Sequence, residues 1–224
     1  MLKKTLGAGL LILGLLSACA NPVPVQNPAL QPQILRQQSA ANPLSSAFFP
    51  VQAGYRWDYG VTIAPVNDPL VEEKGTYTLE LLKSTPAPQG QQLELRAQSS
   101  FTSRYSFPSL LQTNSGVQLQ DMTFLGLGSD EVKGLKIDFL HAGLQNGQRW
   151  EDPNWIAKVK GFESVSVPAG TFQAWRIEVI GTYDHAYTAV GDYWIAPGTG
   201  VVKSKMTIPN WHVETVLTRG GLQR

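Results

Sequence analysis

The sequence predicts a mainly β protein whose strands follow one another in a single antiparallel meander. Apolar and polar residues alternate with a period of two through most of the chain beyond residue 47. Clusters of glycine, proline and asparagine separate the alternating runs, and such clusters mark hairpin turns. No stretch with the helical period is longer than about two turns, so helices are not expected to contribute to the core.

Each expected strand is identified from its own alternation. In residues 55–63, aromatic and aliphatic residues at the odd positions alternate with Arg56, Asp58, Gly60 and Thr62, which predicts a strand with one buried face. The expected strands are residues 55–63, 76–81, 93–98, 101–107, 117–124, 135–140, 156–160, 163–167, 172–183, 186–195, 201–208 and 212–218. The turn signals between them are residues 86–90, 114–116, 145–147, 168–170 and 197–200.

The first nineteen residues have the layout of a secretory signal peptide. Lys3 and Lys4 precede an uncharged run, residues 5–16, which is shorter than the roughly 20 residues that a spanning helix needs. Residues 16–19 read Leu-Ser-Ala-Cys and resemble the bacterial lipobox, in which cleavage before the cysteine is followed by lipid attachment to its sulfur. The sequence therefore predicts cleavage between Ala18 and Cys19 and a lipid anchor on Cys19.

The composition supports this interpretation of Cys19. It is the only cysteine of the 224 residues, so a lipidated chain forms no disulfide. An ordinary signal peptide with an incidental cysteine is the alternative. Removal of Lys3 and Lys4 reduces the 18 basic residues to 16, against 17 acidic ones, and this balance argues against a nucleic-acid partner.

Three segments are expected along the chain. Residues 1–18 form the signal peptide, residues 19–46 a lipidated tether rich in Pro, Gln and Asn, and residues 47–224 one β domain. A short helix around residues 31–38 is weakly indicated. A transmembrane barrel is disfavoured because the expected strands differ in length and charged residues interrupt any continuous lipid-facing belt.

The motifs of common catalytic and metal sites are missing from the sequence. There is no Gly-x-Ser-x-Gly elbow, and the glycines of residues 126–130 lack the lysine of a phosphate-binding loop. His141, His185 and His212 lie far apart and have no ligand-type spacing. The sequence therefore predicts no metal, no cofactor and no enzymatic activity.

Acidic and aromatic residues crowd together at one place, residues 150–155. Glu151 and Asp152 there are adjacent, so in an extended segment they point to opposite faces and do not form the acid pair of a glycosidase. Trp155 and Trp211 lie beside Asn and Pro, which makes them the candidates for exposed ligand contacts, whereas Trp57 and Trp175 lie in phase with core residues.

Three segments resemble a widespread group of uncharacterised bacterial secreted proteins and lipoproteins. They are FFP at residues 48–50 with the following Gly54 and Trp57, VPAGTFQAWRI at residues 167–177, and YWIAPGTGVVK at residues 193–203. The resemblance implies that residues 167–177 form a β turn feeding a strand and that residues 193–203 form a hairpin loop closing the sheet. The group is similar in layout to lipoprotein carriers, which implies a curved open sheet or half-barrel; a closed up-and-down barrel is the alternative.

These observations lead to three functional hypotheses. The first is a membrane-anchored envelope lipoprotein with a non-enzymatic binding or assembly role. In this role the protein holds an apolar ligand on the concave face of its sheet, or it binds an envelope protein partner. The second is a cell-wall glycan or polymer binder that uses exposed indoles, and the third is an envelope hydrolase. Ala20 and Asn21 after the cysteine favour an outer-membrane location where the organism has such a membrane.

Overall fold

The computed structural model describes residues 48–102, 105–121, 133–152, 155–183 and 187–223. The prediction of a mainly β fold is confirmed, and no helical segment able to cross a membrane occurs in these ranges. The strands are β1 (Tyr55–Pro65), β2 (Glu73–Ala87), β3 (Gly90–Ser99), β4 (Tyr105–Ser106), β5 (Ser109–Thr113), β6 (Gly116–Asp121), β7 (Lys133–His141), β8 (Arg149–Asp152), β9 (Trp155–Val167), β10 (Gly170–Tyr183), β11 (Tyr187–Ala196), β12 (Gly200–Ile208) and β13 (Trp211–Leu222).

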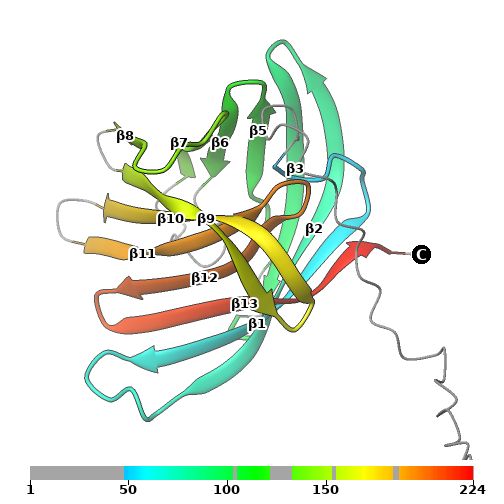
Figure 1. The fold of residues 1–224 in the computed structure, drawn as a ribbon. Helices are drawn as coiled ribbons and strands as arrows, with labels where there is room; N and C mark the ends of the chain where they lie inside the picture. The colour runs from blue at the N-terminus through cyan, green and yellow to red at the C-terminus, as the bar shows by residue number, and fades with distance from the viewer. Residues whose placement is uncertain (1–47, 103–104, 122–132, 153–154, 184–186, 224) are drawn as a thin grey trace, which may run out of the picture. The chain divides into compact units, whose positions relative to one another are not determined.

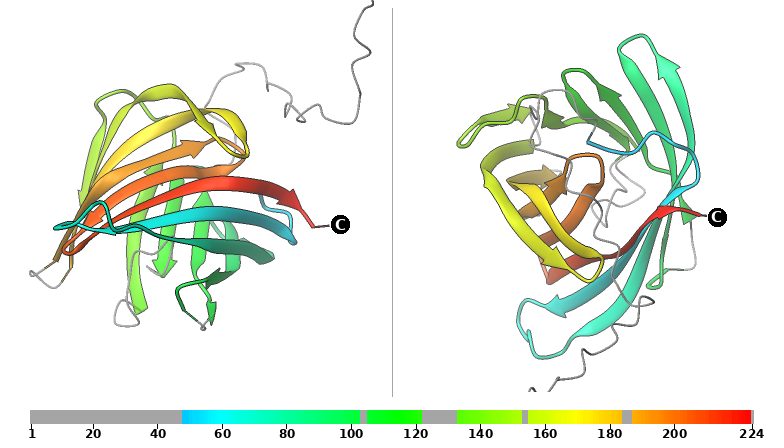
Figure 2. Two further views of the ribbon diagram at one scale, coloured as in Figure 1. Left: turned by 90° about the horizontal axis from the view of Figure 1, so that it is seen from below. Right: turned by 45° about the vertical axis from the view of Figure 1, so that its right-hand side comes forward.

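The thirteen strands form one antiparallel sheet (Figure 1). Its order is β7-β6-β5-β3-β2-β1-β13-β12-β11-β10-β9-β8, with β4 paired to β3 beside this path. Nearly every strand therefore pairs with its neighbour in sequence, and the main exception is the long-range pair of β1 with β13. The predicted meander is confirmed, and Figure 2 shows the strong curvature of the sheet.

The sheet stays open between its two edge strands, β7 and β8. No backbone ladder joins these strands among the described residues, and the closed-barrel alternative is wrong. A side chain spans the gap instead: the Trp150 indole Nε1 donates a hydrogen bond of 2.7 Å to the carbonyl oxygen of Asp138. The Trp150 ring also stacks on His141, with the ring centroids 4.7 Å apart. This boundary between β7 and β8 is called the seam below.

The hydrophobic core covers the concave face of the sheet. Because side chains alternate along a strand, the odd residues of β1 point inward and include Trp57 and Tyr59, which are at most 1% exposed. Trp57 is buried as predicted, and Trp175 is partly buried against the core. Other inward-facing residues are Leu79, Leu81, Leu93, Leu95, Leu110, Leu119, Ile137, Ile177, Val179, Ile195, Val201 and Leu217.

The first described residues are fixed to one end of this core. Phe49 is 1% exposed, and its backbone N–H donates to Oε1 of Gln112 at 2.8 Å while Nε2 of Gln112 donates to its carbonyl at 3.1 Å. The Phe49 ring meets Trp57 edge-on, and the Trp57 indole donates to the carbonyl of Thr199 at 2.6 Å. The segments at residues 48–57 and 193–203 therefore interlock at this end, and their quoted residues have a packing role here.

Some elements differ from the sequence prediction. The expected strands 156–160 and 163–167 are one strand, β9, with a register irregularity opposite Arg176 and Ile177 near Gly161. Of the described residues in the expected strand 101–107, two, Tyr105 and Ser106, pair in the sheet as β4. The strands β5 and β8 were not anticipated. Both are short, so they carry too few alternating positions to be recognised. The expectations for residues 1–47, including the helix near 31–38, lie outside the described residues.

The convex face carries ion pairs, and Asp58 lies at the centre of one group of them. Its carboxylate accepts hydrogen bonds from Arg56 Nε at 2.7 Å, Arg219 Nε at 3.0 Å and Thr78 Oγ1 at 3.1 Å. Partial burial acts to raise the pKa of Asp58, but these hydrogen bonds outweigh it and hold the pKa below its ordinary value. The folded state therefore prefers the ionised carboxylate.

We expect this group to make the domain acid-sensitive. A carboxyl group whose pKa is lowered by folding contributes stability that is present above its unfolded pKa of about 3.9 and is lost as the pH falls through the folded pKa. Asp58→Asn should remove this step, so that urea midpoints between about pH 2 and pH 5 fall less steeply for the variant. Parallel losses in wild type and Asp58→Asn would contradict the assignment.

Candidate functional site

The structure places the predicted ligand contacts in different surroundings. Trp211, at the start of β13, is 41% exposed, as expected. Trp155, at the start of β9, is only 2% exposed, so the prediction that it is exposed is wrong. It pairs with Gly181 and lies in phase with Ala157 and Val159, which are buried on the concave face. Cys19 and the cleavage position at Ala18 lie outside the described residues.

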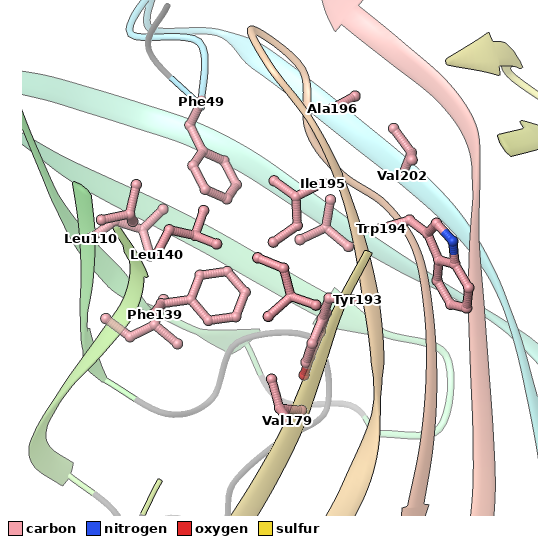
Figure 3. Close-up of a cluster of buried hydrophobic side chains, with 14 of the residues drawn as sticks. Phe49, Leu110, Phe139, Leu140, Val179, Tyr193, Trp194, Ile195, Ala196 and Val202 are labelled. Carbon is pink, nitrogen blue, oxygen red and sulfur yellow. The ribbon is translucent and has the colours of Figure 1, made fainter. Parts of the chain in front are cut away.

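Three aromatic side chains, Phe139, Trp155 and Tyr193, form a cluster on the concave face. Phe139 of β7 lies between Trp155 and Tyr193 of β11, with ring centroids 6.3 Å from the indole and 5.4 Å from the phenol. Figure 3 shows Phe139, Tyr193 and Val179 on the same side of the sheet, whereas Trp194 points to the other side. The contact between Phe139 and Trp155 crosses the seam, because β8 lies at the sheet edge beyond β9.

Two polar atoms in this cluster lack a hydrogen-bond partner among the described residues. They are the indole Nε1 of Trp155 and the hydroxyl of Tyr193, and both side chains are at least nine-tenths buried. A buried donor without an acceptor costs about 1–3 kcal/mol, and native proteins pair most such groups. Burial, with a contribution from nearby Tyr77, raises the pKa of Tyr193, so its hydroxyl remains protonated at neutral pH.

Several comparable donors elsewhere among the described core residues are paired, and one of them, Trp194 Nε1, donates to the carboxylate of Glu163 at 2.7 Å. Trp57 Nε1 donates to Thr199, Trp150 Nε1 donates to Asp138, and the hydroxyl of Tyr59 donates to Val201 at 2.9 Å. Two other buried atoms without partners, Arg176 Nε and Asp192 Oδ1, belong to side chains that already form an ion pair of 2.8 Å. Trp155 and Tyr193 differ because each has a single polar atom, and that atom is unpaired.

A pair of hydroxyl groups extends the polar part of the concave face beside Tyr193. Ser204 is the cross-strand partner of Tyr193, and its Oγ lies 2.6 Å from Oγ1 of Thr215 on β13. Both residues are almost fully buried. Tyr193, Ser204 and Thr215 therefore form a row of hydroxyl side chains across three neighbouring strands, surrounded by aliphatic residues.

The acidic residues considered for catalysis lie away from this cluster. Glu151 is exposed on β8 and is paired with Arg149 at 2.8 Å. The buried polar or charged side chains among the described residues are Gln112, Ser204 and Thr215. No group of three or more His, Cys, Asp or Glu residues in the described ranges could hold a metal ion.

Sequence reasoning identified Trp155 as a contact residue but did not identify Tyr193 or Phe139 as members of a site. The alternation in residues 186–195 predicts that Tyr193 belongs to a strand, which is correct. It does not reveal whether the hydroxyl meets an acceptor, because acceptors come from strands distant in sequence. The acceptor of the Tyr59 hydroxyl, for example, is 142 residues away.

Comparisons with known proteins identify the fold. No protein-family model and no curated protein matches the chain. A crystal structure of a candidate lipoprotein from Parabacteroides distasonis is similar, with a TM-score of 0.55 and 16% identity, and the match covers 79% of this chain and 99% of that one. A candidate exported protein with a YmcC-like fold from Bacteroides fragilis has a TM-score of 0.54 and 13% identity, with 79% and 100% covered. The chain shares the fold of proteins that are described as a lipoprotein and as an exported protein.

Proposed function

We propose that the chain is an exported envelope lipoprotein, anchored through Cys19, whose sheet binds an amphiphilic ligand on its concave face. The lipobox supports the anchor, and the descriptions of the two structural neighbours agree with it. We place the protein on the outer membrane where one exists, because no Asp follows Cys19. We propose a binding role, for which the described part of the concave face offers hydroxyl, amide and indole groups.

The unpaired donors of Trp155 and Tyr193 are the observation that carries the binding role. Both groups only need an acceptor to be satisfied, and a carboxylate, ester or phosphate oxygen would provide one. The surrounding side chains, including Phe139 and Val179, are apolar and would contact an attached acyl chain. The ligand class that fits both surroundings is an acyl amphiphile with an oxygen-rich head.

The seam is the proposed route to these donors. Phe139 and Trp155 lie on either side of the seam. Among the described residues of β7 and β8, one hydrogen bond crosses it, from the Trp150 indole to the backbone carbonyl of Asp138. The inward side chains pack against one another, so a ligand must separate them to enter. Breaking one hydrogen bond between edge strands costs less than opening a paired ladder.

Hydroxyl deletion tests the proposal. We expect solvent extraction of a Cys19→Ala form, secreted with an ordinary cleavable leader so that it carries no covalent lipid, to yield about one amphiphile per protein by mass spectrometry. Tyr193→Phe removes one donor to the ligand and should lower the affinity for that amphiphile roughly three- to tenfold, because a neutral hydrogen bond contributes about 0.5–1.5 kcal/mol.

Tyr59→Phe is the matched control. It removes a hydroxyl that is already paired with Val201, so it should lower stability without changing the bound amphiphile. Extraction of no stoichiometric amphiphile from the wild-type domain, or equal affinities in wild type and Tyr193→Phe, would exclude ligand binding at this cluster.

A buried Trp155 weakens the glycan-binding alternative. Stacking on a sugar needs an accessible ring face, and of the two candidate indoles only Trp211 provides one. No observation on the described residues favours the hydrolase hypothesis.

A further inference from the structure

An ordered loop carries exposed apolar residues at the end of β1. Residues 66–72 connect β1 to β2 through two consecutive turns, closed by hydrogen bonds from Asp68 N to Pro65 O at 3.2 Å and from Val71 N to Asp68 O at 3.1 Å. Pro69 occupies the second position of the latter turn, where its fixed φ is favourable. The loop is also joined to the β12–β13 turn, because Val66 N donates to Asn210 O at 3.0 Å.

The side chains displayed by this loop are unusually exposed for their type. Leu70 is 92% exposed and Val71 is 55% exposed. Trp211, which pairs with Pro65 across β1 and β13, adds a ring that is 41% exposed. We call Val66, Leu70, Val71 and Trp211 the apolar tip. Single exposed apolar residues are common, but a group of them held by defined turns is typical of an interaction surface.

Acidic residues flank the apolar tip. Asp68 lies within the same pair of turns, and Glu72 and Glu73 follow directly, against one nearby cation, Lys74, which lies 3.4 Å from Glu72. The connecting segment therefore has an excess of negative charge. Such a surface is repelled by anionic lipid headgroups and is complementary to a basic protein surface.

The apolar tip lies at the opposite end of β1 from the place where the chain enters the domain. Phe49 packs beside Trp57, near the first residue of β1, whereas the tip begins after its last residue, Pro65. The eleven residues of β1 span about 30 Å or more along the strand. The first described residues and the apolar tip therefore lie near opposite ends of β1.

We propose that the apolar tip is a docking surface for a protein partner that presents an apolar recess flanked by basic side chains. Leu70 would fill the recess, Trp211 would pack at its side, and Asp68 with Glu73 would face the cations. This proposal does not depend on ligand binding at Trp155 and Tyr193.

Site-specific photo-cross-linking of the full, membrane-anchored chain in its native host tests this docking surface. A benzoylphenylalanine placed at position 70 or position 211 should give the same protein adduct, and the same probe at Leu222, which is 45% exposed near the other end of β1, should not give it. Mass spectrometry of the adduct identifies the partner protein. That protein is then purified by itself, and its binding to this chain is measured directly.

Binding of that purified protein should weaken on the order of tenfold with Leu70→Ser and should weaken as the salt concentration rises, while Leu222→Ser should bind like wild type. Four results would overturn the proposal. They are adducts with lipid or with a second copy of this chain at position 70, no adduct there, adducts shared with position 222, and affinity unaffected by Leu70→Ser or by salt.

Discussion

Replacing Gly200 by alanine should destabilise the domain by about 2–5 kcal/mol. Gly200 has a φ of +92°, which an L side chain rarely adopts, and a Cβ built there would lie 2.7 Å from two carbon atoms of the Phe49 ring. The backbone strain contributes about 1–2 kcal/mol and the overpacking about 1–3 kcal/mol. The ring has little freedom to move, because Gln112 holds the Phe49 backbone on both sides. Urea unfolding of the purified domain measures the loss.

The same turn provides a matched control for the Gly200 prediction. Gly198 has a φ of +73°, but a Cβ there would meet nothing within 4 Å, so Gly198→Ala should cost only the backbone strain. A double-mutant cycle with Phe49→Ala isolates the contact, since Gly200→Ala should cost no more than Gly198→Ala once the ring is removed. Equal effects of the two glycine substitutions in the wild-type background would show that Phe49 does not pack against Gly200.

Removing the lipid attachment site should transfer the protein completely from the membrane to the soluble fraction. Acyl chains contribute about 0.8 kcal/mol for each buried CH₂ group, so two or three chains hold the protein firmly, and no other part of the mature sequence carries a cluster of basic residues. Cys19→Ala should therefore abolish attachment and leave the urea midpoint of the β domain unchanged. Fractionation of cells followed by immunoblotting measures the distribution.

The leader needs its own control in that experiment. An uncleaved signal peptide would hold Cys19→Ala in the membrane by its apolar run, so the variant should carry an ordinary cleavable leader. Ser17→Ala in the natural leader keeps a small residue in the lipobox and should remain in the membrane fraction. Correctly processed Cys19→Ala that resists extraction by salt and carbonate would show that another part of the chain is the anchor.

The sequence predicts most of the sheet because local alternation and turn chemistry agree along most of the chain. Pro168 and Pro197 follow the last residues of β9 and β11, as expected of residues without a ladder donor. Gly170 and Gly200, the first residues of β10 and β12, have positive φ angles where the turns end. Strand order within a meander then follows from hairpins between neighbours. The pairing of β1 with β13 has no such local signal.

The candidate site could be predicted only in part. Trp155 follows a proline and an asparagine, and these neighbours predict an exposed loop. In the structure Trp155 instead begins β9, which pairs with the four-residue strand β8. The seam places Phe139 next to Trp155, although β7 and β9 are ten positions apart in the strand order of the sheet. Curvature brings these strands together, and alternation carries no information about curvature.

The central position of β13 limits when the sheet can be completed. β13 is the last strand of the described chain, yet it lies between β1 and β12 and joins the half that runs from β1 to β7 with the half that runs from β12 to β8. As the chain emerges from its N-terminus, each half can form hairpins, but the halves have no shared ladder until the final strand arrives. Pairing β1 with β13 brings together two strands that are far apart in the sequence, and such long-range pairing is slow. A nascent chain would thus stay incompletely folded until β13 has been synthesised. Passage through a membrane as an unfolded chain requires such an incompletely folded state.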